Sequence, residues 1–281
     1  MKLTKFLTTP TSGVTRASAP PAEGDACPTD AGTILSIALD VGADLLRVGG
    51  EIHRVEDTVT RICRAYGAEE VDVFAITSLI TAELRMPDGS YATRSRRVTF
   101  TYNHLARLEA INALSRRICA QPISAEEVRS RLEAIRRYRP VPEWLCYLGG
   151  PIATGGFAVF FGGSIKDGLA AAVIGLLLTL FARLRPVQIN GMVKTLLSSF
   201  AAGALSVICI NVGFGDNVDK IIIGTIMLEI PGLSFGNSLR DMLSGDTLAG
   251  AIRFIQTILQ ALMIALGYMA ALVLFNQQLG G

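Results

Sequence analysis

One acidic side chain, Glu229, stands inside an apolar run of membrane character. The run is broken by Pro231 and Gly232 and passes into a polar stretch. A carboxylate in a bilayer segment costs several kcal/mol unless it is paired, protonated or hydrated. A Pro-Gly break frees backbone groups that lipid cannot satisfy, so such breaks lie in protein or beside water. Glu229 therefore has the chemistry to bind an ammonium group or carry a proton. The alternative is a surface carboxylate paired with Arg240.

Further polar groups follow the break. A helix restarting near residues 234–237 would direct free N–H groups at an anion such as a carboxylate, and Asn237 would donate another hydrogen bond. Arg240, Asp241 and Asp246 are interpreted either as a gating or structural ion pair on the cytoplasmic side or as a solvated loop with helix caps. Asp246 stands where an N-cap for the next apolar helix would be. Broken helices of this kind form substrate sites in secondary transporters. We therefore predict a substrate or proton site that consists of Glu229, Pro231, Gly232 and Asn237.

The elements that must position these groups follow from an uneven distribution of apolar residues. Half of the 281 residues are hydrophobic, and the long apolar runs begin only at Glu143. Residues 1–30 are rich in Thr, Ser, Ala and Pro, which predicts a disordered tail. Residues 31–140 predict a small soluble α+β domain, and residues 141–281 a membrane domain. The expected fold class is an α-helical integral membrane protein with an N-terminal α+β domain.

The membrane domain contains five candidate transmembrane helices, of which the fourth is discontinuous. They lie at residues 143–161, 168–182, 192–210, 220–235 and 247–275. Residues 183–194 contain basic residues and no acid, whereas the loops at Lys166 and Lys220 also contain aspartates. The positive-inside rule then predicts a multi-pass protein of the inner (plasma) membrane with a cytoplasmic soluble domain and an outside C-terminus. An odd span count without an internal copy indicates that another polypeptide or another copy supplies a second half.

The soluble domain shows both helical and strand patterns. Apolar residues recur at helical spacing over residues 33–66, and Gly49-Gly50 interrupts them. Either two helices meet there or the backbone needs a close approach. Residues 71–101 predict a hairpin with its turn at residues 87–90. Helices are expected at residues 102–120 and at 125–137, the latter with Ser124 as its N-cap.

Several classes of function are disfavoured by composition and motif. The net charge of +2 does not favour nucleic-acid binding, and the five cysteines and two histidines follow no metal-ligand spacing. No Walker, GxSxG or GxGxxG pattern occurs, and we expect no cofactor. Four side chains resemble a catalytic cluster only superficially: Asp44, Glu51, His53 and Glu56. We therefore do not expect an enzyme.

Two separated stretches together resemble the threonine/serine exporter (ThrE) family. Residues 40–46, followed by residues 49–56, resemble the opening motif of that family. The second stretch contains Gly49, Gly50, Glu51, Arg54 and Glu56. A second group of residues resembles the late membrane motif of the family: Pro231-Gly232, Asn237, Arg240-Asp241 and Gly245-Asp246. The resemblance covers about residues 31–275.

The resemblance implies export of small polar metabolites, either threonine and serine or succinate-type dicarboxylates, driven by the proton gradient. The chain is most similar to the larger, YjjP-like component of the split form of the family, which implies a YjjB-like membrane partner and an oligomer. Two alternatives remain open. The soluble domain is either part of a membrane-tethered hydrolytic enzyme or a module for regulation and assembly.

Overall fold

The structure is a computed structural model that describes residues 27–139, 141–183 and 190–276. Within these ranges it contains ten helices and three strands. The chain divides into two compact units: residues 1–138 with 237–252, and residues 139–236 with 253–281. Each unit is described by itself. The predicted tail lies almost wholly outside the described residues, as do the middle of the basic loop 183–194 and the end of the chain.

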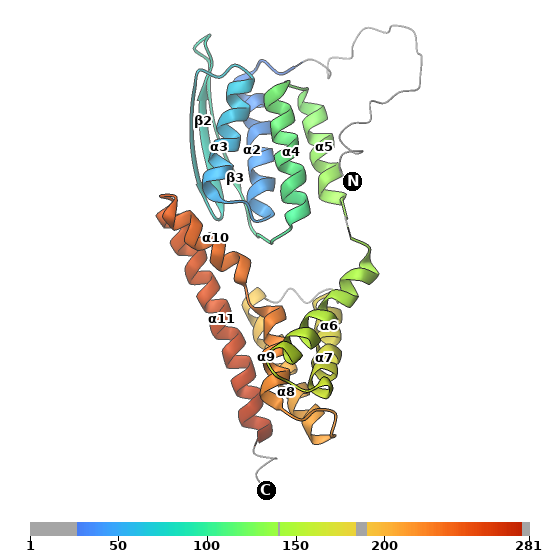
Figure 1. Cartoon of the computed structure of the whole chain (residues 1–281). Helices are drawn as coiled ribbons and strands as arrows, with labels where there is room; N and C mark the ends of the chain where they lie inside the picture. The colour runs from blue at the N-terminus through green and yellow to red at the C-terminus, as the bar shows by residue number, and fades with distance from the viewer. Residues whose placement is uncertain (1–26, 140, 184–189, 277–281) are drawn as a thin grey trace, which may run out of the picture. The chain divides into compact units, whose positions relative to one another are not determined.

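The first unit is built in layers around two central helices. Figure 1 shows the sheet on one side of α2 and α3, and α4 and α5 cover the other side. The elements are α2 (Ala31–Arg47), α3 (Ile52–Ala65), β1 (Glu70–Ile76), β2 (Leu79–Arg85), β3 (Tyr91–Arg97), α4 (Leu105–Ala120) and α5 (Ala125–Arg137). The helix expected from residue 102 begins three residues later. The N-cap predicted for α5 is confirmed, because Ser124 Oγ accepts the N–H of Glu127 at 3.3 Å.

The sheet is a three-stranded antiparallel meander of order β1-β2-β3. The turn predicted at residues 87–90 joins β2 to β3, where Arg85 pairs with Tyr91. The predicted single hairpin is incomplete, because a second turn at Thr77-Ser78 brings Ile76 opposite Leu79. This turn contains neither glycine nor proline, so it lacks the strongest local signals of a turn.

The helix α2 lies at the centre of the core. It is buried on almost all sides, including Leu35, Leu39 and Leu46. Burial on nearly every face is typical of a helix that lies between two layers. Its N-terminus is capped by Asp30, whose carboxylate accepts the N–H of Thr33 at 2.8 Å.

The Gly49-Gly50 interruption separates two helices. Gly49 has a φ of +95°, a left-handed conformation that favours glycine. The Gly50 N–H donates to Leu45 O at 2.9 Å, which closes the end of α2. A Cβ on Gly50 would lie 2.8 Å from that carbonyl oxygen. The sequence left open whether two helices meet at Gly49-Gly50 or the backbone approaches closely there. The structure shows both features.

Asp44 links two helices of the first unit, α2 and α5, through two arginines. Its carboxylate is nearly buried and accepts from Arg47 Nη1 at 2.8 Å on its own helix. It also accepts from Arg136 of α5 at 2.7 and 3.1 Å. These hydrogen bonds raise the pKa of Arg136. The fork of Arg136 thus fixes α5 against α2.

We expect Asp44→Ala to lower the free energy of unfolding of the first unit by about 2 kcal/mol. Removing one member of a fully buried ion pair costs about 3–5 kcal/mol, but here both arginines are partly exposed and regain water. Denaturation of the full chain followed by circular dichroism measures the loss. Asp57→Ala, which removes an exposed i,i+4 pair with Arg61, is the matched control and should cost about 0.5 kcal/mol or less. Equal losses in both variants would contradict the assigned role of Asp44.

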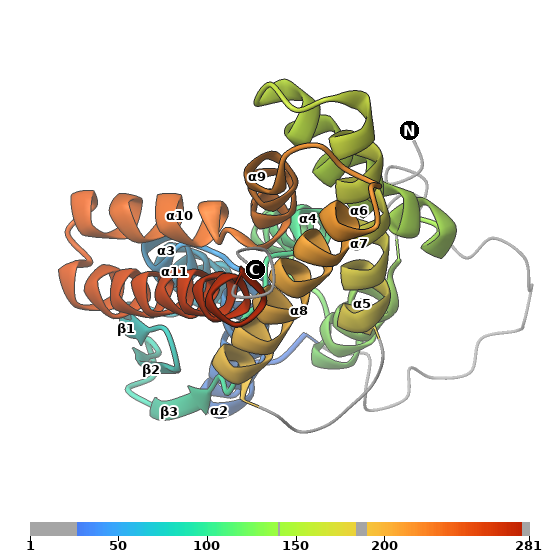
Figure 2. The same ribbon diagram turned by 90° about the horizontal axis from the view of Figure 1, so that it is seen from below.

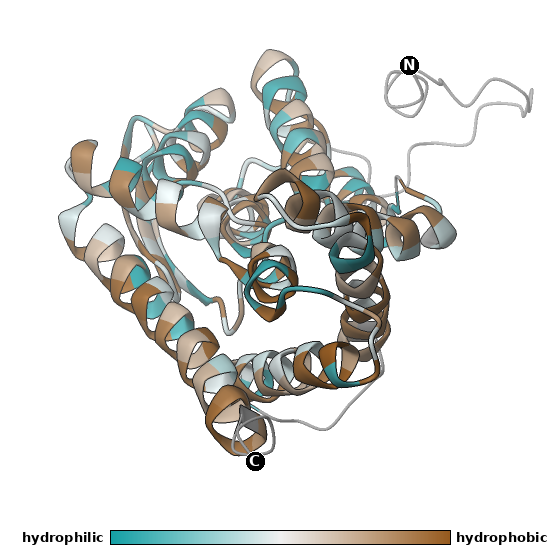
Figure 3. Ribbon diagram, turned by 60° about the horizontal axis from the view of Figure 1, so that its bottom comes forward, coloured by the Kyte–Doolittle hydropathy of each residue, from teal (hydrophilic) through white to brown (hydrophobic). Residues whose placement is uncertain are grey.

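The second unit is a set of apolar helices. They are α6 (Glu143–Phe160), α7 (Ile165–Arg183), α8 (Gly191–Asn211) and α9 (Val218–Glu229), with parts of α10 (Gly232–Leu243) and α11 (Thr247–Asn276). Figure 2 shows α6, α7 and α9 packed together with α8 beside them. In Figure 3 the helix that ends beside the C-terminal trace is mostly hydrophobic. Among the described residues, three helices are long and apolar enough to cross a membrane: Ile165–Ala182, Gly191–Asn211 and Thr247–Phe275.

The remaining two candidate spans are shorter elements. The apolar part of α6 is Trp144–Phe160, and the fourth span consists of two separate short helices, α9 and α10. The discontinuity expected in the fourth span is therefore present. Whether α6 and the α9–α10 pair cross the bilayer stays a prediction.

The two loops that the sequence assigns to the same side meet at one end of the second unit. Asp167, at the start of α7, accepts the N–H groups of Asp216 and Asn217 at 2.7 and 2.9 Å. Lys220 Nζ donates to Phe161 O at 3.0 Å across the same pair of loops. These bonds place the α6–α7 and α8–α9 loops together, as a common side of the membrane requires.

Candidate functional site

Glu229 is the last residue of α9, and its carboxylate is held by two serines of α8. Ser198 Oγ donates to Oε1 and Ser199 Oγ donates to Oε2, each at 2.5 Å. The side chain is partly buried in the second unit, and both of its oxygens have a hydroxyl partner. The acid that the sequence singled out thus connects α9 to α8, and its functional role stays a prediction.

The serine pair was missed by the sequence reasoning. Ser198 and Ser199 stand in the run LLSSF of a helix that is otherwise apolar, where serine is common and needs no ligand. The only feature of the sequence that set these two serines apart was that they are adjacent in an apolar helix. In the structure both hydroxyls lie on the same carboxylate, and Ser198 Oγ also lies 3.0 Å from Thr195 O of its own helix.

A second polar contact lies deeper in the same unit. Tyr268 Oη of α11 donates to Thr225 Oγ1 of α9 at 3.1 Å, and both side chains are buried. Thr225 is one turn before Glu229 on the same helix, so the two contacts lie on neighbouring turns of α9. Hydroxyl groups from α8 and α11 therefore line α9 next to its acid.

Proline accounts for the break after Glu229. The residue before a proline is restricted to extended conformations, and Ile230 has φ −61° and ψ 124°. The helix α10 begins at Gly232, with Phe235 N–H bonded to Pro231 O at 3.0 Å. The predicted restart near residues 234–237 is wrong by two residues or more, because a proline fits the first turn of a helix and needs no N–H there.

The end of α9 is fixed by close packing on α6. A Cβ on Gly224 would lie 2.5 Å from Thr154 O and 2.8 Å from Ala158 Cβ. Such contact is possible only because Gly224 has no side chain. Thr154 in turn donates to Ala171 O of α7 at 2.8 Å. The segment that carries Glu229 thus rests on a tight α6–α7–α9 core.

In the first unit, the two stretches that resemble the family motifs come together. Asn237 Nδ2 of α10 donates to Gly49 O at 3.4 Å. Arg240 Nη1 pairs with Glu51 Oε1 at 2.5 Å. These contacts join residues separated by nearly two hundred positions in the chain. Asn237 therefore contacts the glycine turn, and its predicted donation to a substrate stays untested.

Asp241 caps the start of α3 from a distant part of the chain. The N-cap residue of α3, Glu51, makes no capping hydrogen bond with its own side chain. Asp241 Oδ1 instead accepts the N–H of Ile52 at 3.3 Å, and both residues are buried. A carboxylate at a helix N-terminus also interacts favourably with the helix dipole. Arg240 and Asp241 thus both contact the N-terminus of α3, and the gating role predicted for Arg240, Asp241 and Asp246 stays a prediction.

The other motif residues lie around the contact between α10 and the N-terminus of α3. Arg54 lies 3.5 Å from Glu51. Glu56 Oε1 accepts the N–H of Ala75 at 2.8 Å and so links α3 to β1. Asp246 immediately precedes α11, at the predicted N-cap position, but its Oδ2 is buried without a hydrogen-bond partner among the described residues.

Burial raises the pKa of Glu56, and the nearby carboxylate of Asp246 raises it further. A raised pKa means that folding favours the protonated acid. The free energy of unfolding therefore falls as the pH rises from the ordinary glutamate pKa through the raised one. We expect Glu56→Gln to flatten this dependence and to stabilise the first unit at neutral pH. Thermal unfolding from pH 4 to pH 8 measures it, with Glu83→Gln, an exposed change on β2, as control. A steeper dependence in Glu56→Gln would contradict the assignment.

The described residues offer no metal centre, since no three His, Cys, Asp or Glu side chains gather in that part of the chain. The acids of the superficial catalytic cluster instead have structural partners: Asp44 holds arginines, Glu51 pairs with Arg240, and Glu56 accepts a backbone N–H.

Comparison with known proteins decides the family. Residues 36–275 match the ThrE family, described as "Putative threonine/serine exporter". This chain belongs to the ThrE family. It is a membrane protein of a family of exporters, in agreement with its long apolar helices.

One curated relative gives less information, because it is itself uncharacterized. The chain is 28% identical over 176 residues to the uncharacterized protein C16A10.01 of Schizosaccharomyces pombe. The match covers 58% of this ThrE chain and 21% of that protein, so the chain spans about a fifth of the length of this relative. No solved structure matches the chain.

Proposed function

We propose that this ThrE chain is part of a proton-coupled exporter of small polar metabolites, with Glu229 as the residue that carries the proton or binds the substrate ammonium group. The observation that carries the proposal is the contact of both Glu229 oxygens with serine hydroxyls, next to a helix break in an apolar unit. Threonine and serine are the first substrates to consider, because the family description names them. Succinate-type dicarboxylates are the second.

The serine partners suit a group that changes its protonation state. A hydroxyl both donates and accepts, so Ser198 and Ser199 can satisfy Glu229 when it is ionised and, after rotation, when it is protonated. An arginine or lysine partner would instead favour the ionised form alone. The serine pair can therefore hydrogen-bond Glu229 in both of its protonation states.

The break supplies the complementary chemistry. The first turn of α10, beginning at Gly232, lies at the positive end of that helix's dipole. Such an end favours the carboxylate of an amino acid, while Glu229 favours its ammonium group. Together the two groups match a zwitterion, which is the form of threonine and serine at neutral pH.

The proposal includes a setting for the chain. The first unit lies in the cytoplasm, the membrane is the inner (plasma) membrane, and the C-terminus is outside, as the distribution of basic residues supports. Secondary transporters are commonly made of two related halves. We propose that a YjjB-like partner supplies further membrane helices and that the working transporter is an oligomer.

Efflux from cells tests the proposal. Cells loaded with labelled threonine, serine or succinate should release at least one of them several-fold faster when they carry the chain together with a YjjB-like partner. The control is the partner alone. Equal release of all three substrates with and without the chain would overturn the proposed activity.

A further inference from the structure

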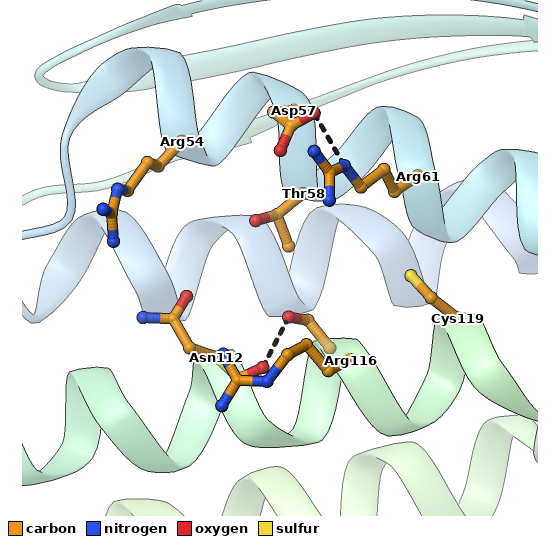
Figure 4. A pocket seen from close by; sticks show the side chains of 8 residues that line it. Arg54, Asp57, Thr58, Arg61, Asn112, Arg116 and Cys119 are labelled. Atoms are coloured by element: carbon orange, nitrogen blue, oxygen red, sulfur yellow. Dashed lines mark hydrogen bonds and ion pairs between the residues drawn. The ribbon is translucent and has the colours of Figure 1, made fainter.

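A polar groove of about 430 Å³ runs between α3 and α4 in the first unit. On the α3 side it is lined by Arg54, Asp57, Thr58 and Arg61, which repeat at i, i+3, i+4 and i+7. On the α4 side it is lined by Asn112, Ser115, Arg116 and Cys119, with the same spacing. Each set therefore forms one continuous face of its helix (Figure 4).

The composition of these two faces is unusual for neighbouring helices. Faces with this spacing that meet in a fold are normally apolar. Here α3 buries a different stripe, which includes Val55, Val59 and Ile62, in the core of the unit. The groove is thus not required for packing. Figure 4 shows Arg54 and Thr58 pointing from α3 toward the side of Asn112.

The groove carries an excess of positive charge. It has three arginines and one aspartate, and Asp57 is already paired with Arg61 at 2.8 Å. Arg54 has only a long contact of 3.5 Å to Glu51. Arg116 has no ion-pair or hydrogen-bond partner within the described residues. Burial raises the pKa of the Cys119 thiol, so that thiol is neutral and adds no negative charge.

We propose that this groove binds a small organic or inorganic anion with two or more negative charges, held by Arg54 and Arg116. The guanidinium fork binds carboxylate and phosphate oxygens in pairs, and both groups share this chemistry. Thr58 and Asn112 line the same groove and can hydrogen-bond a hydroxyl or a second oxygen of the ligand. The volume lies in the range of small-molecule sites. This binding site is separate from the transport site and does not depend on Glu229.

Calorimetric titration of the full chain in detergent tests the site. Succinate, citrate and inorganic phosphate are titrated separately, with acetate as a singly charged comparison. We expect at least one of the first three to bind with a Kd of about 1 mM or lower, and acetate at least about tenfold more weakly. The preferred anion distinguishes carboxylate from phosphate recognition. Absence of binding by all three overturns the proposal.

Variants locate the binding. Arg116→Ala should weaken it at least about tenfold, since each lost charge-assisted hydrogen bond has an effect of that order. Arg116→Lys, which keeps the charge but loses the fork, should give an intermediate loss. Arg64→Ala changes an exposed residue of α3 outside the groove, and this variant should bind the anion with the affinity of the unchanged chain.

A last variant separates this site from the transport site. Glu229→Gln should keep anion binding, because Glu229 is not part of the groove. Binding that survives in an Arg54→Ala, Arg116→Ala double variant but is lost in Glu229→Gln would belong to the transport site, and the groove proposal would fail.

Discussion

Replacing Glu229 by glutamine is expected to reduce proton-driven efflux of threonine and serine at least about tenfold, a rise of about 1.4 kcal/mol in the barrier. Glutamine has nearly the same shape and still contacts Ser198 and Ser199, but it neither binds nor releases a proton. The pH dependence of efflux should flatten for the same reason. Initial efflux rates between pH 5.5 and pH 8 measure both effects.

The matched control for this variant is Asp219→Asn. Asp219 lies on the first turn of the same helix, α9, and is exposed. The Asp219→Asn variant also removes one negative charge from α9, but at a position without contact to the serine pair. Its efflux rate and pH profile should therefore be those of the unchanged chain. An unchanged rate and pH profile in Glu229→Gln would reduce that residue to a structural role.

Asp241→Ala should release the N-terminal turn of α3. The buried N–H of Ile52 loses its acceptor, and a hydrogen bond to a charged group contributes about 2 kcal/mol. That difference corresponds to a roughly thirtyfold faster amide exchange at Ile52 and its neighbours. Hydrogen–deuterium exchange of the full chain, resolved to the peptide that contains residues 49–56, measures the change. Transport should also fall if the junction positions α10.

Two further variants give the comparison for Asp241. Asp241→Asn keeps an oxygen acceptor and should retain most of the protection of Ile52. Asp72→Ala removes an exposed acid on β1, and exchange at residues 49–56 should not respond. Unaltered exchange at Ile52 in Asp241→Ala would mean that the hydrogen bond does not hold this turn.

Local chemistry made some features predictable. Glu229 was conspicuous because a lone acid is costly in an apolar run, and Pro231 marked the break because proline ends a helix. Gly49-Gly50 indicated a special backbone, although only the structure distinguished two helices from one interrupted helix. The Ser124 cap followed from its spacing to Glu127.

Long-range features were not predictable in this way. Nothing near Asp241 in the sequence indicates that it caps a helix that begins at Ile52, because the contact depends on how the whole unit folds. Ser198 and Ser199 resemble ordinary small residues of a packed helix until Glu229 is opposite them. The turn at Thr77-Ser78 was missed because its strands determine it, and its residues carry no turn signal.

The polar groove between α3 and α4 shows a third limit to what can be predicted from the sequence. The spacing of Arg54, Asp57, Thr58 and Arg61 is visible in the sequence, but a charged stripe on a helix is usually a solvated face. Its interpretation changes only when Arg116 and Asn112 on α4 lie across from it. A pattern on one helix therefore indicates a surface, and its partner helix decides whether that surface is a site.

Proton movement in proteoliposomes tests the central claim most directly. Vesicles that contain the chain with its YjjB-like partner are loaded with threonine and a pH-sensitive dye, and efflux is started by dilution. Threonine release should be accompanied by opposite proton entry, and Glu229→Gln should abolish the proton signal. Threonine release without proton movement, or an equal proton signal in Glu229→Gln, would rule out proton coupling through Glu229.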